Sequence, residues 1–148
     1  MKEHAHPNSQ RAPWHLWLVG LLGLLFNSVG AFDYLMTQTQ NESYMGRFTS
    51  EQLDVLYGLP AWLVASWALA VWGGALGALL MLLRKRLAVA VLLVSLLAMS
   101  VTGVHNVFAV NGLYETGGTG PVFILLIFLV ALSLWFYARA MRERGTLV

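Results

Sequence analysis

Four long apolar runs dominate this sequence, and they restrict the fold more than any other feature. The runs cover residues 13–36, 61–83, 87–110 and 121–138. Each reaches or approaches the roughly 20 apolar residues that a helix needs to cross a hydrocarbon core about 30 Å thick. Since backbone amide and carbonyl groups find no partner in lipid, a spanning run of this kind must form a helix. The sequence therefore predicts an all-α, polytopic membrane protein with a four-transmembrane-helix bundle.

The composition agrees with this class. Apolar residues make up 58% of the 148 residues and charged residues only 11%, whereas soluble domains are about 45–50% apolar and about 25% charged. The length suits a single integral membrane domain over residues 1–148. The chain contains no cysteine, which excludes disulfide chemistry, thiolate metal sites and a cysteine nucleophile.

Basic residues are concentrated in three short stretches that alternate with stretches nearly free of them. They are Lys2 and Arg11, then Arg84, Lys85 and Arg86, then Arg139, Arg142 and Arg144. Short loops rich in Lys and Arg stay on the cytoplasmic side of a membrane, so both termini are predicted to be cytoplasmic. Basic residues spread over several helix ends suit anionic lipid headgroups better than nucleic acid. Arg47 lies elsewhere, among acidic residues, and we expect it to be a solvated loop charge.

The first apolar run could instead be a secretory signal peptide, because Val29-Gly30-Ala31 resembles a small-residue cleavage site. A signal peptide has an apolar region of about 7–15 residues, and this run is longer. Polar Asn27 also interrupts it close to the would-be site. We therefore expect the run to be retained as the first transmembrane helix.

The segment between the first two runs, residues 37–59, is the one substantial stretch outside the predicted spans. Thr49 followed by Gln52 forms the pattern of a capping box, which is typical of a helix start. Apolar residues follow at helical spacing over 53–57. We expect a short amphipathic helix here, lying across the outer mouth of the bundle. The glycine-rich segment 111–120 predicts a loop.

Small and polar residues recur every three or four positions along three of the runs. They are Gly20, Gly23, Asn27, Gly30, Tyr34 and Thr37 in the first run, Ser66, Ala70, Gly73 and Gly77 in the second, and Ser95, Ala98, Thr102 and His105 in the third. Small residues let helices approach closely in lipid. We expect these three seams to face one another at the bundle centre, and close packing alone is enough to explain the glycines.

Two polar layers emerge when depth is counted from the cytoplasmic end of each helix. At 1.5 Å per residue, Asp33 lies about 28 Å along the first helix and His105 about 27 Å along the third. Tyr34 and Asn106 adjoin them. An Asp and a His at one depth can form a pair that binds a proton, a cation or a polar ligand. The alternative is that both residues are interfacial and hydrated.

The second layer is deeper. By the same count Asn27 and Ser100 lie about 20 Å from the cytoplasmic surface, and Trp72 about 17 Å. Polar residues near mid-membrane usually face the bundle interior. They either form hydrogen bonds between helices or line the floor of a cavity that opens at the outer layer. The candidate pocket residues are therefore Asn27, Asp33, Tyr34, Trp72, His105 and Asn106.

Metal, cofactor and enzyme functions find little support. His4 and His6 have no third ligand nearby, and His15 and His105 lie at opposite ends of the membrane, where they cannot share a haem. No motif of a serine hydrolase, zinc protease or phosphate-binding loop is present. We expect no cofactor, no metal ion and no catalytic residue.

The segment FNSVGAFDYLMT at 26–37, followed by YGLPAW at 57–62, resembles a family of small bacterial membrane proteins. The members have about this length and four predicted helices, and some carry the label sugar transporter. The resemblance implies a bacterial inner membrane and favours transport slightly over other functions. It implies no particular substrate or functional residue.

Two hypotheses for function follow. In the first, the protein binds or transports a small polar molecule through a pocket open to the outer face; a chain with four helices would then need a homo-oligomer to form a path. In the second, it is a non-catalytic accessory or scaffold subunit of a larger membrane complex. A membrane enzyme acting on a lipid or quinone would need more polar residues than the helices offer.

Overall fold

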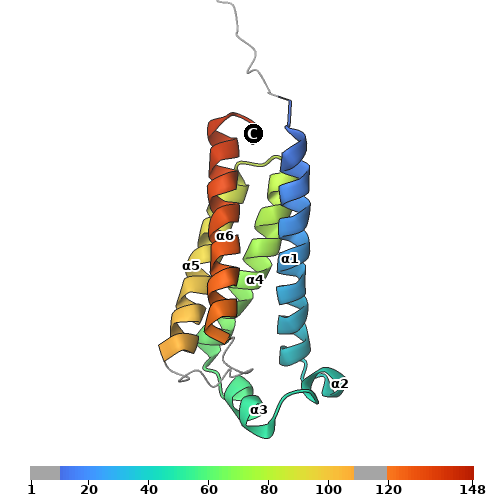
Figure 1. The fold of residues 1–148 in the computed structure, drawn as a ribbon, viewed down its shortest axis with the longest axis vertical. Coiled ribbons are helices and arrows are strands. Elements are labelled where there is room, and N and C mark those ends of the chain that lie inside the picture. The colour runs from blue at the N-terminus through green and yellow to red at the C-terminus, as the bar shows by residue number, and fades with distance from the viewer. Residues whose placement is uncertain (1–10, 109–119) are drawn as a thin grey trace, which may run out of the picture.

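The computed structural model describes residues 11–108 and 120–148. Four long helices run side by side through the molecule (Figure 1). They are α1 (Trp14–Gln38), α4 (Ala61–Leu82), α5 (Leu87–Phe108) and α6 (Gly120–Glu143). All four are long and apolar enough to cross a membrane, which confirms the predicted all-α fold with four candidate spans. His4, His6 and almost all of the loop predicted at 111–120 lie outside the described residues.

The helix boundaries follow from local chemistry. Pro13 and Pro60 precede α1 and α4 in extended conformations, where the missing amide of proline removes no helical hydrogen bond. The predicted fourth helix ends at residue 138, but α6 continues to Glu143. The extra turn carries three charged residues, and within it the Arg139 Nε donates a hydrogen bond to Glu143 four residues later, at 3.0 Å.

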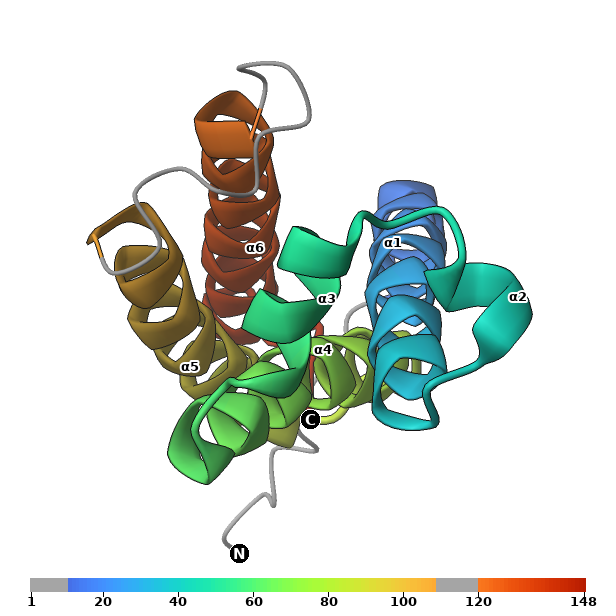
Figure 2. The same cartoon turned by 90° about the horizontal axis from the view of Figure 1, so that it is seen from below.

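We name the two ends of the bundle by their charges. At the basic end α1 begins, α4 turns into α5, and α6 finishes; Arg84, Lys85, Arg86, Arg139, Arg142 and Arg144 lie there. At the acidic end lie two short helices, α2 (Glu42–Met45) and α3 (Ser50–Tyr57), which bring Glu42, Glu51 and Asp54. Figure 2, an end-on view, shows α3 lying across the bundle at this end.

The short helix α3 confirms the capping-box prediction. The Thr49 hydroxyl accepts a hydrogen bond from the Gln52 amide at 3.3 Å, and the Gln52 side chain accepts one from the Thr49 amide at 3.0 Å. Leu56 is buried beneath the helix. The sequence did not predict α2, which is a single turn capped by Asn41, whose side chain accepts from the Tyr44 amide.

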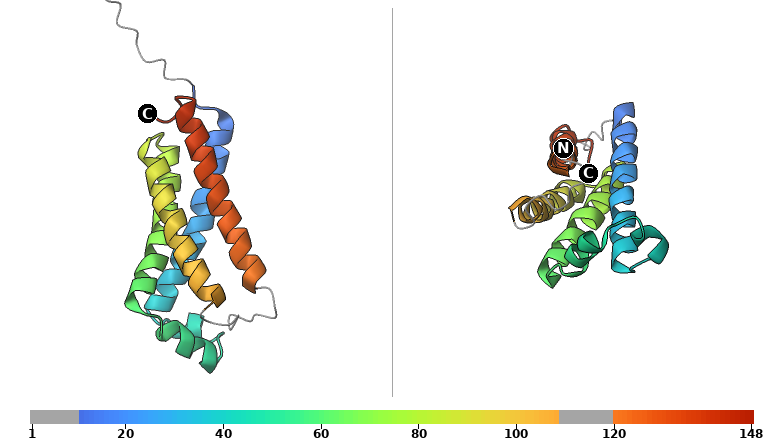
Figure 3. Two further views of the ribbon diagram at one scale, coloured as in Figure 1. Left: turned by 90° about the vertical axis from the view of Figure 1, so that its left-hand side faces the viewer. Right: turned by 60° about the horizontal axis from the view of Figure 1, so that its bottom comes forward.

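Helix α4 occupies the middle of the packing order. It packs against α1 on one side and α5 on the other, and α6 packs mainly against α5. Near the basic end α1 also meets α6, where the Gly23 backbone lies close against Leu134 and His15 forms a hydrogen bond with Tyr137. Figure 3 shows α6 crossing beside α1 at this end and diverging from it toward the acidic end. The bundle is therefore closed at one end and spread at the other.

The hydrophobic core lies at the closed, basic end. Its fully enclosed members come from all four long helices and from the segment after α6, and they are Leu16, Met81, Ala88, Val89, Leu92, Leu134, Ala138, Met141 and Leu147. Among the four spans, α6 has the smallest buried share, 11% against 33% for α5. Helix α6 is therefore the span least covered by the rest of the bundle.

The small-residue seams of α4 and α5 face each other, as predicted, but the α1 seam does not join them at one centre. The α4 seam packs on α5: the Ser66 hydroxyl donates to the Ala98 carbonyl at 2.9 Å, and the Ser95 hydroxyl donates to the Ala70 carbonyl at 2.5 Å. Helix α1 instead meets a different stripe of α4, where Gly74 faces Asn27. Since α1 and α5 use different faces of α4, residues at equal depth on α1 and α5 need not meet.

Candidate functional site

Asp33, the central residue of the predicted outer layer, is hydrogen-bonded to a residue of α2. The Tyr44 hydroxyl donates a hydrogen bond to Asp33 Oδ1. The Tyr44 ring packs edge-on against Phe32 at 5.8 Å between centroids, and the Arg47 guanidinium lies 3.5 Å above the same ring. A carboxylate, a phenol and a guanidinium therefore form one cluster at the acidic end, which joins the end of α1 to α2.

The cluster raises the pKa of the Tyr44 phenol above its ordinary value. Partial burial is the main cause, followed by the hydrogen bond to Asp33 and by the negative charge of that carboxylate; Arg47 opposes the shift. The phenol therefore remains protonated and keeps donating to Asp33. Arg47 is exposed, as expected for a loop charge, but its stacking on Tyr44 was not predicted.

His105 does not pair with Asp33, so the predicted Asp–His pair is absent from the described part of the chain. Its imidazole packs edge-on against Trp62 of α4, with ring centroids 5.8 Å apart. The Nδ1 atom of His105 is buried and has no hydrogen-bond partner within the described residues. The predicted pair fails because α1 and α5 contact different faces of α4, which separates residues of equal depth.

Aromatic contacts join α1 to α4 at the same end. Tyr34 packs edge-on against Trp67, with ring centroids 5.1 Å apart. Trp62 is 56% exposed, so one face of its indole remains open to the surroundings. Asn106 follows His105 on α5 and is half-buried. The acidic end thus carries three neighbouring aromatic contacts, at the α1–α2, α1–α4 and α4–α5 junctions.

Asn27 lies in the interface where α1 packs on α4. Its side-chain amide donates to the Gly23 carbonyl of its own helix at 2.8 Å. Its Oδ1 lies so close to Gly74 that a Cβ there would meet it at 1.9 Å. Ser100, its partner in the predicted deeper layer, donates to the Leu96 carbonyl of its own helix at 2.8 Å. Neither side chain forms a hydrogen bond between helices in the described residues.

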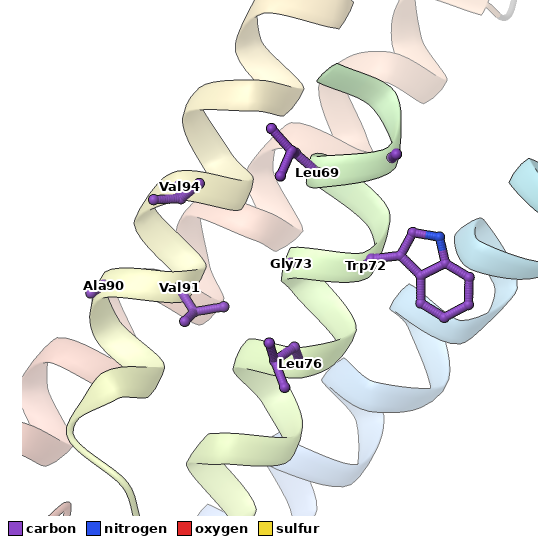
Figure 4. Close-up of a pocket in the computed structure, with 8 residues that line it drawn as sticks. Leu69, Trp72, Gly73, Leu76, Ala90, Val91 and Val94 are labelled. Atoms are coloured by element: carbon purple, nitrogen blue, oxygen red, sulfur yellow. The ribbon is translucent and has the colours of Figure 1, made fainter. Parts of the chain in front are cut away.

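Trp72 does not join Asn27 in a central cavity. Its side chain is 46% exposed, and Figure 4 shows the indole directed away from α5. Trp72 lies at the edge of an apolar groove of about 460 Å³ on α4 and α5, which is lined by Ala68, Leu69, Trp72, Gly73, Leu76, Ala90, Val91 and Val94. The sequence indicates how deep Trp72 lies in the membrane, but not the direction in which its side chain points around the helix axis. In the structure that direction places Trp72 toward lipid.

Tyr44 is the partner of Asp33 that sequence reasoning missed. Its spacing from the Asn41 cap is a signal for a turn, but nothing in the sequence shows that this turn folds back onto Asp33.

In the residues that the structure covers, no group of three His, Asp or Glu side chains could hold a metal ion. Comparisons with protein-family models, with curated proteins and with solved structures found no match to this chain.

Proposed function

We propose that this polytopic membrane protein binds a small polar molecule at the acidic end of its bundle. The observation that carries the proposal is the buried Nδ1 atom of His105, which has no hydrogen-bond partner among the described residues and belongs to a ring packed against the exposed indole of Trp62. A buried polar atom without a partner costs about 1–3 kcal/mol. A ligand that covers Trp62 and hydrogen bonds to the imidazole, after a small rotation of the ring brings Nδ1 to the surface, would recover that cost.

The roles of the candidate residues differ from those expected from depth alone. In this proposal His105 and Trp62 contact the ligand, and Tyr34 and Asn106 flank them. Asp33 holds α2 in place through Tyr44. Asn27 and Trp72 have no part in the site. The protein has a binding role and no catalytic one.

Charge favours a neutral or cationic ligand. Asp33, Glu42, Glu51 and Asp54 lie at the acidic end, and in the described part of the chain Arg47 alone opposes them. An excess of negative charge attracts cations and repels anions over several ångströms. Exposed aromatic rings such as Trp62 also bind cations through their faces.

The orientation is part of the proposal. Loops rich in Lys and Arg remain cytoplasmic, so the basic end lies inside and the acidic end outside. Membership of the small four-helix family that the sequence resembles would make the location a bacterial inner membrane. Ligand would then arrive from the external side. Transport would require a second copy of the chain, because the basic end of one bundle is filled by packed apolar side chains.

The thermal stability of the purified protein tests the binding site. Three classes of probe, namely monosaccharides, amino acids and aliphatic amines, are added at millimolar concentration to the protein in detergent. We expect one class to raise the melting temperature, and His105→Ala to abolish the rise. His15→Ala is the matched control, since it removes the same side chain at the basic end. If no class stabilises the protein, or if His105→Ala responds like the wild type, the proposal is wrong.

A second candidate function is that of an accessory subunit. The groove on α4 and α5 favours it, because an apolar surface lined in part by Gly73 and two alanines suits the approach of another helix. Crosslinking in native membranes separates the two functions. A stable partner of a different sequence, lost when the exposed groove residue Ala90 is changed to Leu, would support the accessory role.

A further inference from the structure

The turn between α4 and α5 is held by the segment that follows α6. The Arg84 backbone has φ 59, a left-handed conformation that few residues other than glycine adopt. The Val148 amide donates to the Arg84 carbonyl at 2.7 Å, and the Arg86 amide donates to the Val148 carbonyl at 3.1 Å. This two-way backbone pairing holds the turn in its unusual conformation.

The same segment positions two guanidinium groups. The Arg84 Nε donates to the Thr146 carbonyl at 3.0 Å, and the Arg86 Nε donates to the next carbonyl, that of Leu147, at 3.3 Å. Thr146 and Leu147 are 3% and 0% exposed, so these carbonyls belong to a rigid part of the core. The arginine stems are therefore fixed, and the Lys85 side chain between them is exposed.

Basic side chains outnumber acidic ones at this end in the described residues. Within residues 11–108 and 120–148, Glu143 is the acidic residue of the basic end, and it already accepts from Arg139. Arg142 and Arg144 are exposed and add to the charge. The negative end of the α4 dipole and the positive end of the α5 dipole both lie at the turn and offset each other, so the side-chain charges determine the field there.

The charged turn adjoins apolar surface. Leu83 and Leu87 flank it in the chain and are 58% and 66% exposed. A free anion such as phosphate would use the charges and leave these leucines uncovered. A phospholipid would use both, because its phosphate meets the basic residues while its acyl chains cover the leucines. Arginine is suited to phosphate, since its planar group can donate two parallel hydrogen bonds.

We propose that Lys85 and Arg86, positioned by the 145–148 segment, form a binding site for the headgroup of an anionic phospholipid. The site is at the opposite end from the ligand site proposed above and does not depend on it. It is specific in that it uses a turn of fixed conformation. A diffuse attraction would instead involve every basic residue at this end equally.

Lipid titration of the full-length protein tests the site. The protein in neutral detergent is titrated with phosphatidylglycerol, with phosphatidylcholine of the same acyl chains, and with inorganic phosphate, and bound lipid is measured by native mass spectrometry. We expect retention of phosphatidylglycerol, little of phosphatidylcholine, and no competition by phosphate. The double variant Lys85→Gln/Arg86→Gln should bind phosphatidylglycerol roughly thirtyfold more weakly, because each basic residue near a lipid headgroup contributes about fivefold.

Two variants make the result decisive. Arg139→Gln removes a charge at the same end, but one already engaged with Glu143, so it should bind phosphatidylglycerol like the wild type. Lys85→Gln alone changes an exposed side chain and keeps the arginine contacts, so it stays informative if the double variant does not fold; we expect about fivefold weaker binding. If Arg139→Gln and Lys85→Gln lose equal affinity for phosphatidylglycerol, the attraction is diffuse and the proposed site is wrong. Unchanged phosphatidylglycerol binding in Lys85→Gln would also contradict the site. Displacement of the lipid by inorganic phosphate would also contradict it.

Discussion

The contact between Asn27 and Gly74 shows how one residue fixes the distance between two helices. The side-chain oxygen of Asn27, Oδ1, occupies the space that a side chain at position 74 would need. The depth count correctly placed Asn27 within the bundle, but the sequence could not distinguish a pocket floor from a packing contact. That distinction depends on which residue of α4 faces it, and several glycines of α4 were equally available.

Replacing Gly74 by alanine should therefore destabilise the protein. The new Cβ would lie 1.9 Å from Asn27 Oδ1, and overpacking of this kind costs about 1–3 kcal/mol. Gly103→Ala is the control, because its Cβ would meet Ile124 at an ordinary 3.5 Å. The free energy of unfolding in mixed micelles checks both. Adding Asn27→Ala to Gly74→Ala should restore most of the loss, and a loss that remains in the double variant would count against the contact.

The Tyr44 phenol provides a second prediction at the scale of one residue. Its pKa is raised above 10.0 by burial and by Asp33. A raised pKa stabilises the fold below pH 10, and this contribution is lost as the pH rises through the higher value. The ultraviolet titration of the wild type minus that of Tyr44→Phe should show one tyrosine with a midpoint above 10.0. Asp33→Asn should move that midpoint down. A midpoint that Asp33→Asn leaves unchanged would contradict the hydrogen bond.

At the scale of elements, the sequence predicted helices that carry their own signals. The long apolar runs and the Thr49–Gln52 capping box are local patterns, and each indicates a helix without reference to the tertiary fold. Helix α2 was missed because a single turn has no periodicity to detect. The order of packing was also not predictable, because α4 has small residues on two faces and composition does not say which neighbour takes which face.

The capping box of α3 can be tested on its own. Thr49→Ala removes the hydroxyl that accepts from the Gln52 amide, and loss of such a cap costs about 1 kcal/mol. Because α3 lies outside the spans, we expect faster hydrogen exchange in α3 and little change in the four long helices. Ser50→Ala, at the neighbouring position, should leave the exchange of α3 unchanged. Uniformly faster exchange throughout the chain would show that α3 is not a separate unit.

At the scale of the whole molecule, the two ends of the bundle differ in both charge and packing. The basic end is closed by core residues and by the 145–148 segment, whereas α3 lies across the acidic end, where α6 has diverged from α1. The sequence predicted this charge difference directly from the positions of Lys and Arg. It did not predict the difference in packing, which results from the divergence of α6 from α1.

The absence of cysteine allows the orientation to be measured with single introduced thiols. Ser43→Cys places an exposed thiol at the acidic end, and Val148→Cys places one at the basic end, where Val148 is 55% exposed. In intact cells a membrane-impermeant maleimide should label Ser43→Cys. It should label Val148→Cys only after permeabilisation. The opposite pattern would reverse the proposed orientation.

The most direct test of ligand binding at the acidic end is the nitrogen-15 spectrum of the histidines. The chain has four of them, so selective labelling gives few signals, and single substitutions assign them. On addition of the probe that stabilises the protein, we expect a shift of the His105 Nδ1 resonance and none for His15. A probe that stabilises the protein but leaves the His105 signals unchanged would contradict ligand binding at His105.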